Sequence, residues 1–228
     1  MPAPGRHRSD GRLRARPAGG VALGLPLARS SLGLGHERDA LLHVPPAAAA
    51  RPLPLVVLLH GAGSSAQAGI ALLADLADEH GLLLLAPDSR GSTWDVIRGG
   101  FGPDVEFLDT ALEYVFASCP VERARIALGG FSDGASYALS LSITNGDLFS
   151  HLVAFSPGFA APAEPVGRPR IFVTHGVGDR VLPIERCSRQ LVPVLRGGGY
   201  DVTYEEFDGG HTVPPALARR GVTWLAAP

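Results

Sequence analysis

The sequence predicts an α/β protein with a mostly parallel central sheet and helices on both faces. Short, uninterrupted apolar runs alternate with stretches of helical spacing along most of the chain. Runs such as 55–59 and 82–86 lack polar alternation, as is expected of strands covered on both faces. Parallel strands also need crossover connections of about helix length, and the intervening stretches provide them.

The predicted elements follow one another in a regular order. Segment 31–44 is typical of an antiparallel strand pair that opens the sheet. Further strands are predicted at 55–59, 82–86, 125–129, 151–155, 170–174 and 202–207. Helices are predicted at 67–80, 105–116, 134–144, 184–195 and 214–225. Residues 156–169 are rich in proline and glycine and too few for a cap of several helices, so we expect no substantial lid domain.

Composition excludes several classes of function. A length of 228 residues fits one domain, and a net charge of −2 gives no electrostatic case for nucleic acid as a partner. The chain contains no lysine, which removes Schiff-base chemistry and phosphate loops of the Walker type. Its two cysteines, Cys119 and Cys187, exclude a disulfide framework but leave one bridge open. No apolar run is long enough for a transmembrane segment.

The N-terminal residues 1–30 differ from the rest of the chain. Five arginines precede a short apolar run at 21–28, which contains Pro26 and is not followed by a clean cleavage site. We therefore expect a solvated, flexible basic tail in place of a signal peptide, and a cytoplasmic protein. Residues 31–228 are expected to form a single domain.

The segment 130–134 has the pattern Gly-x-Ser-x-Gly, with Ser132 at its centre. A predicted strand runs directly into it and a helix of small residues leaves it. A nucleophile at such a strand-to-helix turn needs a tight backbone, which flanking glycines permit. The helix N-terminus also directs free N–H groups at the position of a developing oxyanion. The alternative is a plain glycine-rich turn; the context favours Ser132 as a nucleophile.

A serine hydroxyl needs a base, and the base needs an acid to orient it. His211 follows the strand 202–207, and Asp179 follows the strand 170–174. Both therefore lie at carboxyl ends of strands, where active sites of parallel sheets are found. The order Ser132, Asp179, His211 is also the order that this mechanism has in such sheets. Asp208 is the alternative acid, but it lies only three residues from His211.

A fourth element, 60–63, reads His-Gly-Ala-Gly and follows the buried strand 55–59. Such a turn supplies a backbone N–H to an oxyanion hole. Phosphate binding would need a longer glycine pattern or a following lysine, and neither is present. We expect structural roles for His60 and for His175, which precedes a glycine at a strand end.

Together these four elements resemble the α/β-hydrolase superfamily, and within it the phospholipase/carboxylesterase branch of predicted esterases. That branch also holds acyl-protein thioesterases and polyhydroxybutyrate-depolymerase-like proteins. The resemblance covers residues 41–225 and implies an α/β-hydrolase fold. It implies that the backbone N–H groups of Ala62 and Asp133 form the oxyanion hole. Many thioesterase-like members carry Gln where this chain has Asp133, which argues against acyl-protein substrates.

The pattern and the resemblance predict a serine carboxylesterase that works through an acyl-enzyme on small-molecule or lipid-like esters, without metal or organic cofactor. A thioesterase or lysophospholipase-type hydrolase, an acyltransferase, and a non-catalytic binding protein of this fold are the alternatives. A homodimer is left open. Four residues on loops beyond strand ends are candidates for the substrate pocket: Trp94, Phe101, Phe159 and Leu182.

Overall fold

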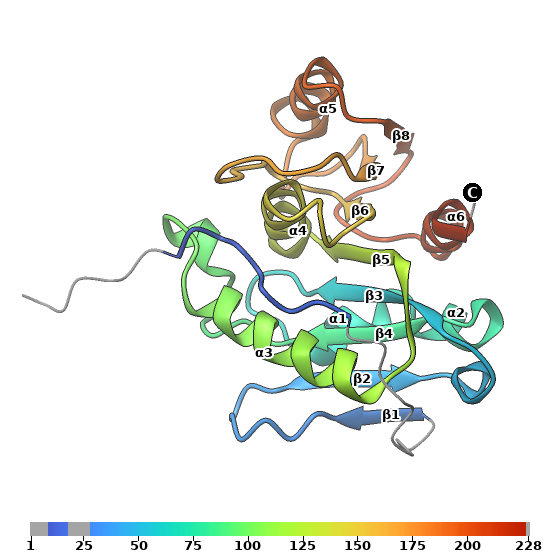
Figure 1. Cartoon of the computed structure of the whole chain (residues 1–228). Helices are drawn as coiled ribbons and strands as arrows, with labels where there is room; N and C mark the ends of the chain where they lie inside the picture. Colours follow the sequence, from blue (N-terminus) through green and yellow to red (C-terminus); the bar gives the residue numbers. More distant parts are fainter. Residues whose placement is uncertain (1–8, 18–27, 227–228) are drawn as a thin grey trace, which may run out of the picture.

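The computed structural model describes residues 9–17 and 28–226. Within them, eight strands form one sheet in the order β1-β2-β4-β3-β5-β6-β7-β8 (Figure 1). The pairs β1/β2 and β2/β4 are antiparallel, and the other neighbouring pairs are parallel. The strands are β1 (Ala28–Ser31), β2 (Ala40–Val44), β3 (Leu53–Leu59), β4 (Leu83–Pro87), β5 (Val121–Phe131), β6 (His151–Phe155), β7 (Arg170–Gly176) and β8 (Val202–Phe207).

Helices cover both faces of this sheet, as predicted (Figure 1). They are α1 (Ala66–Ala71), α2 (Ala74–His80), α3 (Pro103–Ser118), α4 (Asp133–Thr144), α5 (Ser188–Gly197) and α6 (Pro215–Ala226). Helices α3, α4 and α5 bury their apolar residues in one core cluster, and α1, α2 and α6 bury theirs in a second. The sheet separates the two clusters, which confirms the predicted α/β class.

Two predicted helices are each divided. The stretch 67–80 forms α1 and α2, because the backbone leaves the helical region at Leu73, whose side chain is only 1% exposed. The stretch 184–195 begins as a short 3₁₀ turn, Ile184–Arg186, and α5 starts only at Ser188. Periodicity alone does not reveal such breaks, since the apolar spacing continues through them.

The prediction of a solvated tail at 1–30 is wrong for residues 9–17. Leu13 is 2% exposed, and its N–H donates to the Asn145 side chain at 2.8 Å. Arg12 forms an ion pair with Asp147 at 2.8 Å. One buried leucine and several specific hydrogen bonds hold this segment beside α3 and α4 (Figure 1). Of the apolar run 21–28, all but Ala28 lies outside the described residues.

Segment 156–169, between β6 and β7, contains no α-helix, in agreement with the predicted lack of a lid domain. Cys119 and Cys187 are both buried and free of disulfide bonds. Among the described residues, no helix is both long and apolar enough to span a bilayer.

Candidate active site

Ser132 lies in the turn between β5 and α4, with a backbone φ of +59° and ψ of −123°. A residue other than glycine is strained at this positive φ, which is the conformation of a nucleophile elbow. The Ser132 N–H donates to the Phe155 carbonyl at 3.0 Å, and this bond fixes the turn. A Cβ atom on Gly134 would overlap the Leu59 carbonyl, so the start of α4 can approach the end of β3 only with glycine there.

Three predicted residues meet at the carboxyl end of the sheet. Nε2 of His211 lies 2.9 Å from Oγ of Ser132, and Nδ1 of His211 lies 2.6 Å from Oδ2 of Asp179. These residues come from the ends of β5, β7 and β8, which explains why three distant positions converge. Asp208, the alternative acid, is exposed and makes no hydrogen bond or ion pair within the described part of the chain. The geometry therefore favours Asp179 as the partner of His211.

Asp179 is 5% exposed as a residue, its carboxylate is fully buried, and the carboxylate has several hydrogen-bond donors. Its Oδ1 accepts the backbone N–H groups of Val181 and Leu182, both at 2.9 Å. Burial alone would raise the pKa of Asp179, but the hydrogen bonds from His211 and from these N–H groups outweigh it and lower the pKa. Asp179 is thus held as an anion that can orient the imidazole and stabilise its protonated form.

His175 also faces Asp179, an arrangement that the sequence reasoning did not anticipate. Its Nε2 lies 2.8 Å from the Leu182 carbonyl oxygen and 3.3 Å from Oδ2 of Asp179, and its Nδ1 lies 2.7 Å from Oγ of Ser188. Burial lowers the pKa of His175, so the ring is neutral. Both neighbours of Nε2 are acceptors, which assigns the proton to that nitrogen. No sequence pattern marks this contact, because a spacing of four residues indicates proximity on a helix, whereas His175 lies in β7 and Asp179 in the loop after it.

Both predicted oxyanion donors lie near Ser132. Asp133 follows Ser132 at the start of α4, and a Cβ on Gly61, next to Ala62, would lie 3.5 Å from the Ser132 Cβ. Within the described part of the chain, neither the Ala62 nor the Asp133 N–H donates to an acceptor. Two unpaired N–H groups beside a nucleophile match the requirement for binding a developing oxyanion.

The loop after β4 holds both oxyanion-donor segments in place through two hydrogen bonds. The Gly63 N–H donates to the Ser92 carbonyl at 2.6 Å. The Thr93 hydroxyl donates to the Asp133 carboxylate at 2.7 Å. The Asp133 side chain is therefore anchored away from the nucleophile, and its backbone N–H is held in place.

The structure does not bring the four predicted pocket residues together. Trp94 is 1% exposed, its Nε1–H donates to the His60 carbonyl at 2.8 Å, and its ring stacks on Tyr137 at 5.1 Å. Phe101 is also buried, because the N-terminal segment covers it. These two assignments are wrong: a loop position beyond a strand end does not prevent a large ring from turning into the core.

Phe159 and Leu182 lie on the loops that follow β6 and β7. Phe159 is 36% exposed and Leu182 is half-buried, with its methyl groups close to Gly158. Both are accessible, but neither lines the large cleft beside His211.

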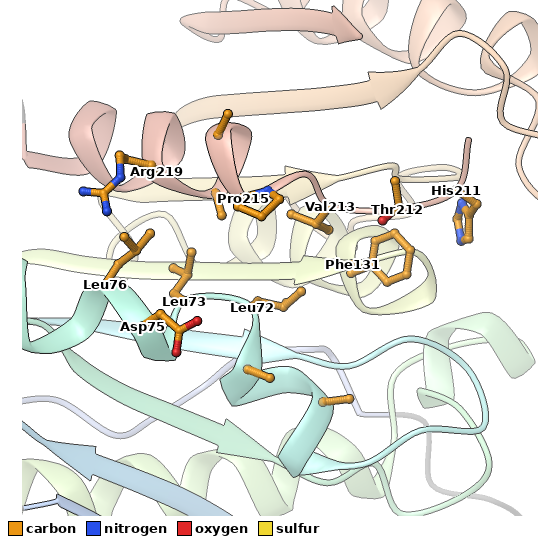
Figure 2. Close-up of a pocket in the computed structure, with 14 residues that line it drawn as sticks. Leu72, Leu73, Asp75, Leu76, Phe131, His211, Thr212, Val213, Pro215 and Arg219 are labelled. Atoms are coloured by element: carbon orange, nitrogen blue, oxygen red, sulfur yellow. The ribbon is translucent and has the colours of Figure 1, made fainter. Parts of the chain in front are cut away.

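That cleft has a volume of about 780 Å³ and lies between α1–α2 and α6 (Figure 2). Phe131 and His211 border one end of it, and Asp75 and Arg219 border the other. Its remaining lining is mostly apolar: Ala68, Ala71, Leu72, Leu73, Leu76, Val213, Pro215, Ala216 and Ala218. Sequence reasoning missed these residues, since their helical spacing is equally well explained by packing on the sheet.

Known proteins resemble this chain in sequence and in structure. It is 27% identical over 184 residues to "Putative esterase NocK" of Nocardia uniformis subsp. tsuyamanensis, covering 74% of this chain and 53% of that protein. It is 34% identical over 101 residues to acyl-protein thioesterase 1 of Gibberella zeae, covering 40% of this chain and 43% of the relative. The chain thus spans about half the length of these relatives. No protein-family model matches it.

Among solved structures, the crystal structure of esterase PE8 matches with a TM-score of 0.66 and 25% identity, over 81% of this chain and 96% of that one. The chain has the α/β-hydrolase fold and is similar to esterases. The proteins similar to this chain include esterases and a thioesterase. The resemblance inferred from the motifs is confirmed at this level. Within the described part of this α/β-hydrolase, no cluster of three or more His, Cys, Asp or Glu residues is placed to hold a metal ion.

Proposed function

We propose that the protein is a serine carboxylesterase in which Ser132 is the nucleophile, His211 the general base and Asp179 the orienting acid. The hydrogen-bonded chain from Ser132 Oγ through the His211 imidazole to the Asp179 carboxylate, with distances of 2.9 and 2.6 Å, is the observation that carries the proposal. A nucleophile, base and orienting group within hydrogen-bond reach are what acyl transfer needs. The similarity to proteins named as esterases supports the same chemistry.

In the first half-reaction, Ser132 Oγ attacks the ester carbonyl carbon while its proton passes to Nε2 of His211. The N–H groups of Ala62 and Asp133 stabilise the oxyanion. Collapse of the intermediate breaks the bond to the leaving oxygen, which takes the proton from Nε2 and departs as the alcohol. Asp179 holds the imidazole in one tautomer and stabilises its charge throughout.

In the second half-reaction, water attacks the acyl group on Ser132 and gives a proton to Nε2 of His211. The tetrahedral intermediate then releases the carboxylic acid, and Ser132 Oγ recovers the proton. An alcohol in place of water would make the protein an acyltransferase, since both react with the same acyl-enzyme.

A thioesterase is the second candidate, because the chain is 34% identical over 101 residues to a protein named acyl-protein thioesterase 1. The same residues would cleave a thioester, with a thiol as the leaving group. Comparing kcat/KM for an oxygen ester and a thioester that share one acyl group distinguishes the two. The remaining predictions, a cytoplasmic location, a possible homodimer and lipid-like substrates, stay predictions.

The proposal is tested by hydrolysis of p-nitrophenyl acetate and by labelling with a fluorophosphonate probe. Ser132→Ala should abolish both while the protein stays folded by circular dichroism, because loss of a triad nucleophile costs about 10⁶-fold in kcat. Ser150→Ala, at the opposite end of β6 from the site, is the matched control and should keep wild-type rates. Retention of more than about a tenth of kcat in Ser132→Ala would exclude Ser132 as the nucleophile.

A further inference from the structure

The cleft between α1–α2 and α6 has an apolar floor. Leu72, Phe131 and Val213 line it, and all three are partly buried against the second core cluster. The exposed small side chains of Ala71 and Ala216 lie on its opposite walls, from α1 and α6. A volume of about 780 Å³ falls within the usual range of small-ligand sites. An apolar group bound there would remove this floor from water.

The two ends of the cleft differ in polarity (Figure 2). At one end the His211 imidazole lies against the Phe131 ring, with 4.6 Å between the ring centroids. Asp75 and Arg219 lie at the other end of the cleft, and Arg219 forms an ion pair with Glu79 at 2.7 Å. The end next to His211, where Thr212 also lines the cleft, is therefore the uncharged one, and the charges lie away from it.

The position of His211 indicates which part of an ester enters the cleft. In serine hydrolases the base returns its proton to the leaving oxygen, so the leaving group must lie beside the imidazole. The carbonyl oxygen, in contrast, points to the oxyanion donors, Ala62 and Asp133. Since His211 itself borders the cleft, apolar surface lies next to the imidazole beside which the leaving group must be placed.

We propose that this cleft binds the apolar leaving group of the substrate, an alkyl or aryl alcohol, and that it makes the enzyme selective for esters of such alcohols. The inference rests on the proposed esterase activity. It predicts that kcat/KM rises along acetate esters from ethyl to hexyl, by about two- to fourfold for each added methylene that the cleft buries. Along methyl esters from acetate to hexanoate, with methanol as the constant leaving group, the cleft should contribute no such rise.

A charge on the cleft wall tests the site. Ala216→Asp places a carboxylate in the first turn of α6, where helices tolerate it well, and Ala71→Asp places one on the opposite wall. Both should flatten the rise in kcat/KM along the acetate esters of longer alcohols, because a buried carboxylate disfavours an apolar leaving group. Ala50→Asp, an exposed alanine in the loop before β3, is the matched control and should change neither series.

The outcomes separate the two proposals. If wild type hydrolyses no ester and binds no fluorophosphonate, the proposed function fails and this inference with it. If wild type is active but Ala216→Asp and Ala71→Asp reduce the methyl-ester series instead, the cleft holds the acyl chain and the inference is overturned. Unchanged profiles in both series would also overturn it, while leaving the esterase activity established.

Discussion

His175 and His211 approach the same oxygen of Asp179, at 3.3 Å and 2.6 Å. His175 is fully buried and neutral, and its Nε2–H faces both that oxygen and the Leu182 carbonyl. The Leu182 N–H in turn donates to the other oxygen of Asp179. The end of β7 and the loop that follows it therefore both orient the carboxylate that in turn orients His211, and His175 is a positioning residue for the proposed triad.

His175→Leu should lower kcat by about tenfold, because Asp179 loses a donor that holds it toward His211. It should also cost about 1–3 kcal/mol of unfolding free energy, since the Ser188 hydroxyl and the Leu182 carbonyl lose their buried partner. His175→Gln, which retains a side-chain N–H donor, should recover part of kcat. Steady-state kinetics and urea unfolding measure both effects. A kcat of His175→Leu within twofold of wild type would remove His175 from this role.

Asp179→Asn should lower kcat by about 10⁴-fold, because an amide favours the wrong tautomer of His211. Asp208→Asn, three residues from His211 on an exposed loop, is the matched control and should stay within about tenfold of wild type. Both variants are compared on one activated ester at the same pH. If Asp208→Asn were the inactive enzyme and Asp179→Asn the active one, the acid would be misassigned.

Trp94→Phe removes the N–H that donates to the His60 carbonyl at 2.8 Å but keeps an aromatic ring against Tyr137. We expect a lower kcat, because the His60–Gly63 turn carries the Ala62 N–H, and an unchanged preference for chain length. Trp94→Ala should in addition cost about 3–5 kcal/mol of stability, since it leaves a large cavity. Ester-length profiles and thermal unfolding measure these effects. A profile changed by Trp94→Phe would instead mean that the ring contacts substrate.

The contrast between Ser132 and Trp94 explains what the sequence could and could not predict. Ser132 was identifiable because its φ of +59° and the close approach of Gly134 to β3 impose a glycine pattern that appears in the sequence. The direction of a side chain on a loop leaves no such pattern, so Trp94 and Phe101 were misplaced. The prediction for segment 9–17 fails for a related reason, which is that its fixed structure depends on contacts outside the segment. Its single buried leucine, Leu13, is fixed by distant partners that local composition does not reveal.

Asp95 and Asp104 hold the loop that carries Thr93 and Trp94. Asp95 accepts the N–H groups of Gly102 and Asp104, at 2.8 and 2.9 Å, and Asp104 accepts the Asp95 N–H at 2.7 Å. Burial, and then the nearby charge of Asp104, raise the pKa of Asp95 to about 6. An unfolded aspartate ionises near a pKa of about 3.9, so between the two values the folded state binds more protons. Stability from this group is therefore lost as the pH rises from about 4 to about 6.

Asp95→Asn cannot ionise, and its carbonyl oxygen can still accept both N–H groups. The difference in unfolding free energy between Asp95→Asn and wild type should therefore grow in favour of the variant across that pH range, by on the order of 2 kcal/mol. Urea unfolding at pH 4, 5, 6 and 7 measures it, and taking the difference cancels the titration of all other groups. If the difference in unfolding free energy between Asp95→Asn and wild type did not change with pH, Asp95 would already be ionised at pH 4 in the folded protein. The N–H donors alone would then stabilise the two neighbouring carboxylates of Asp95 and Asp104.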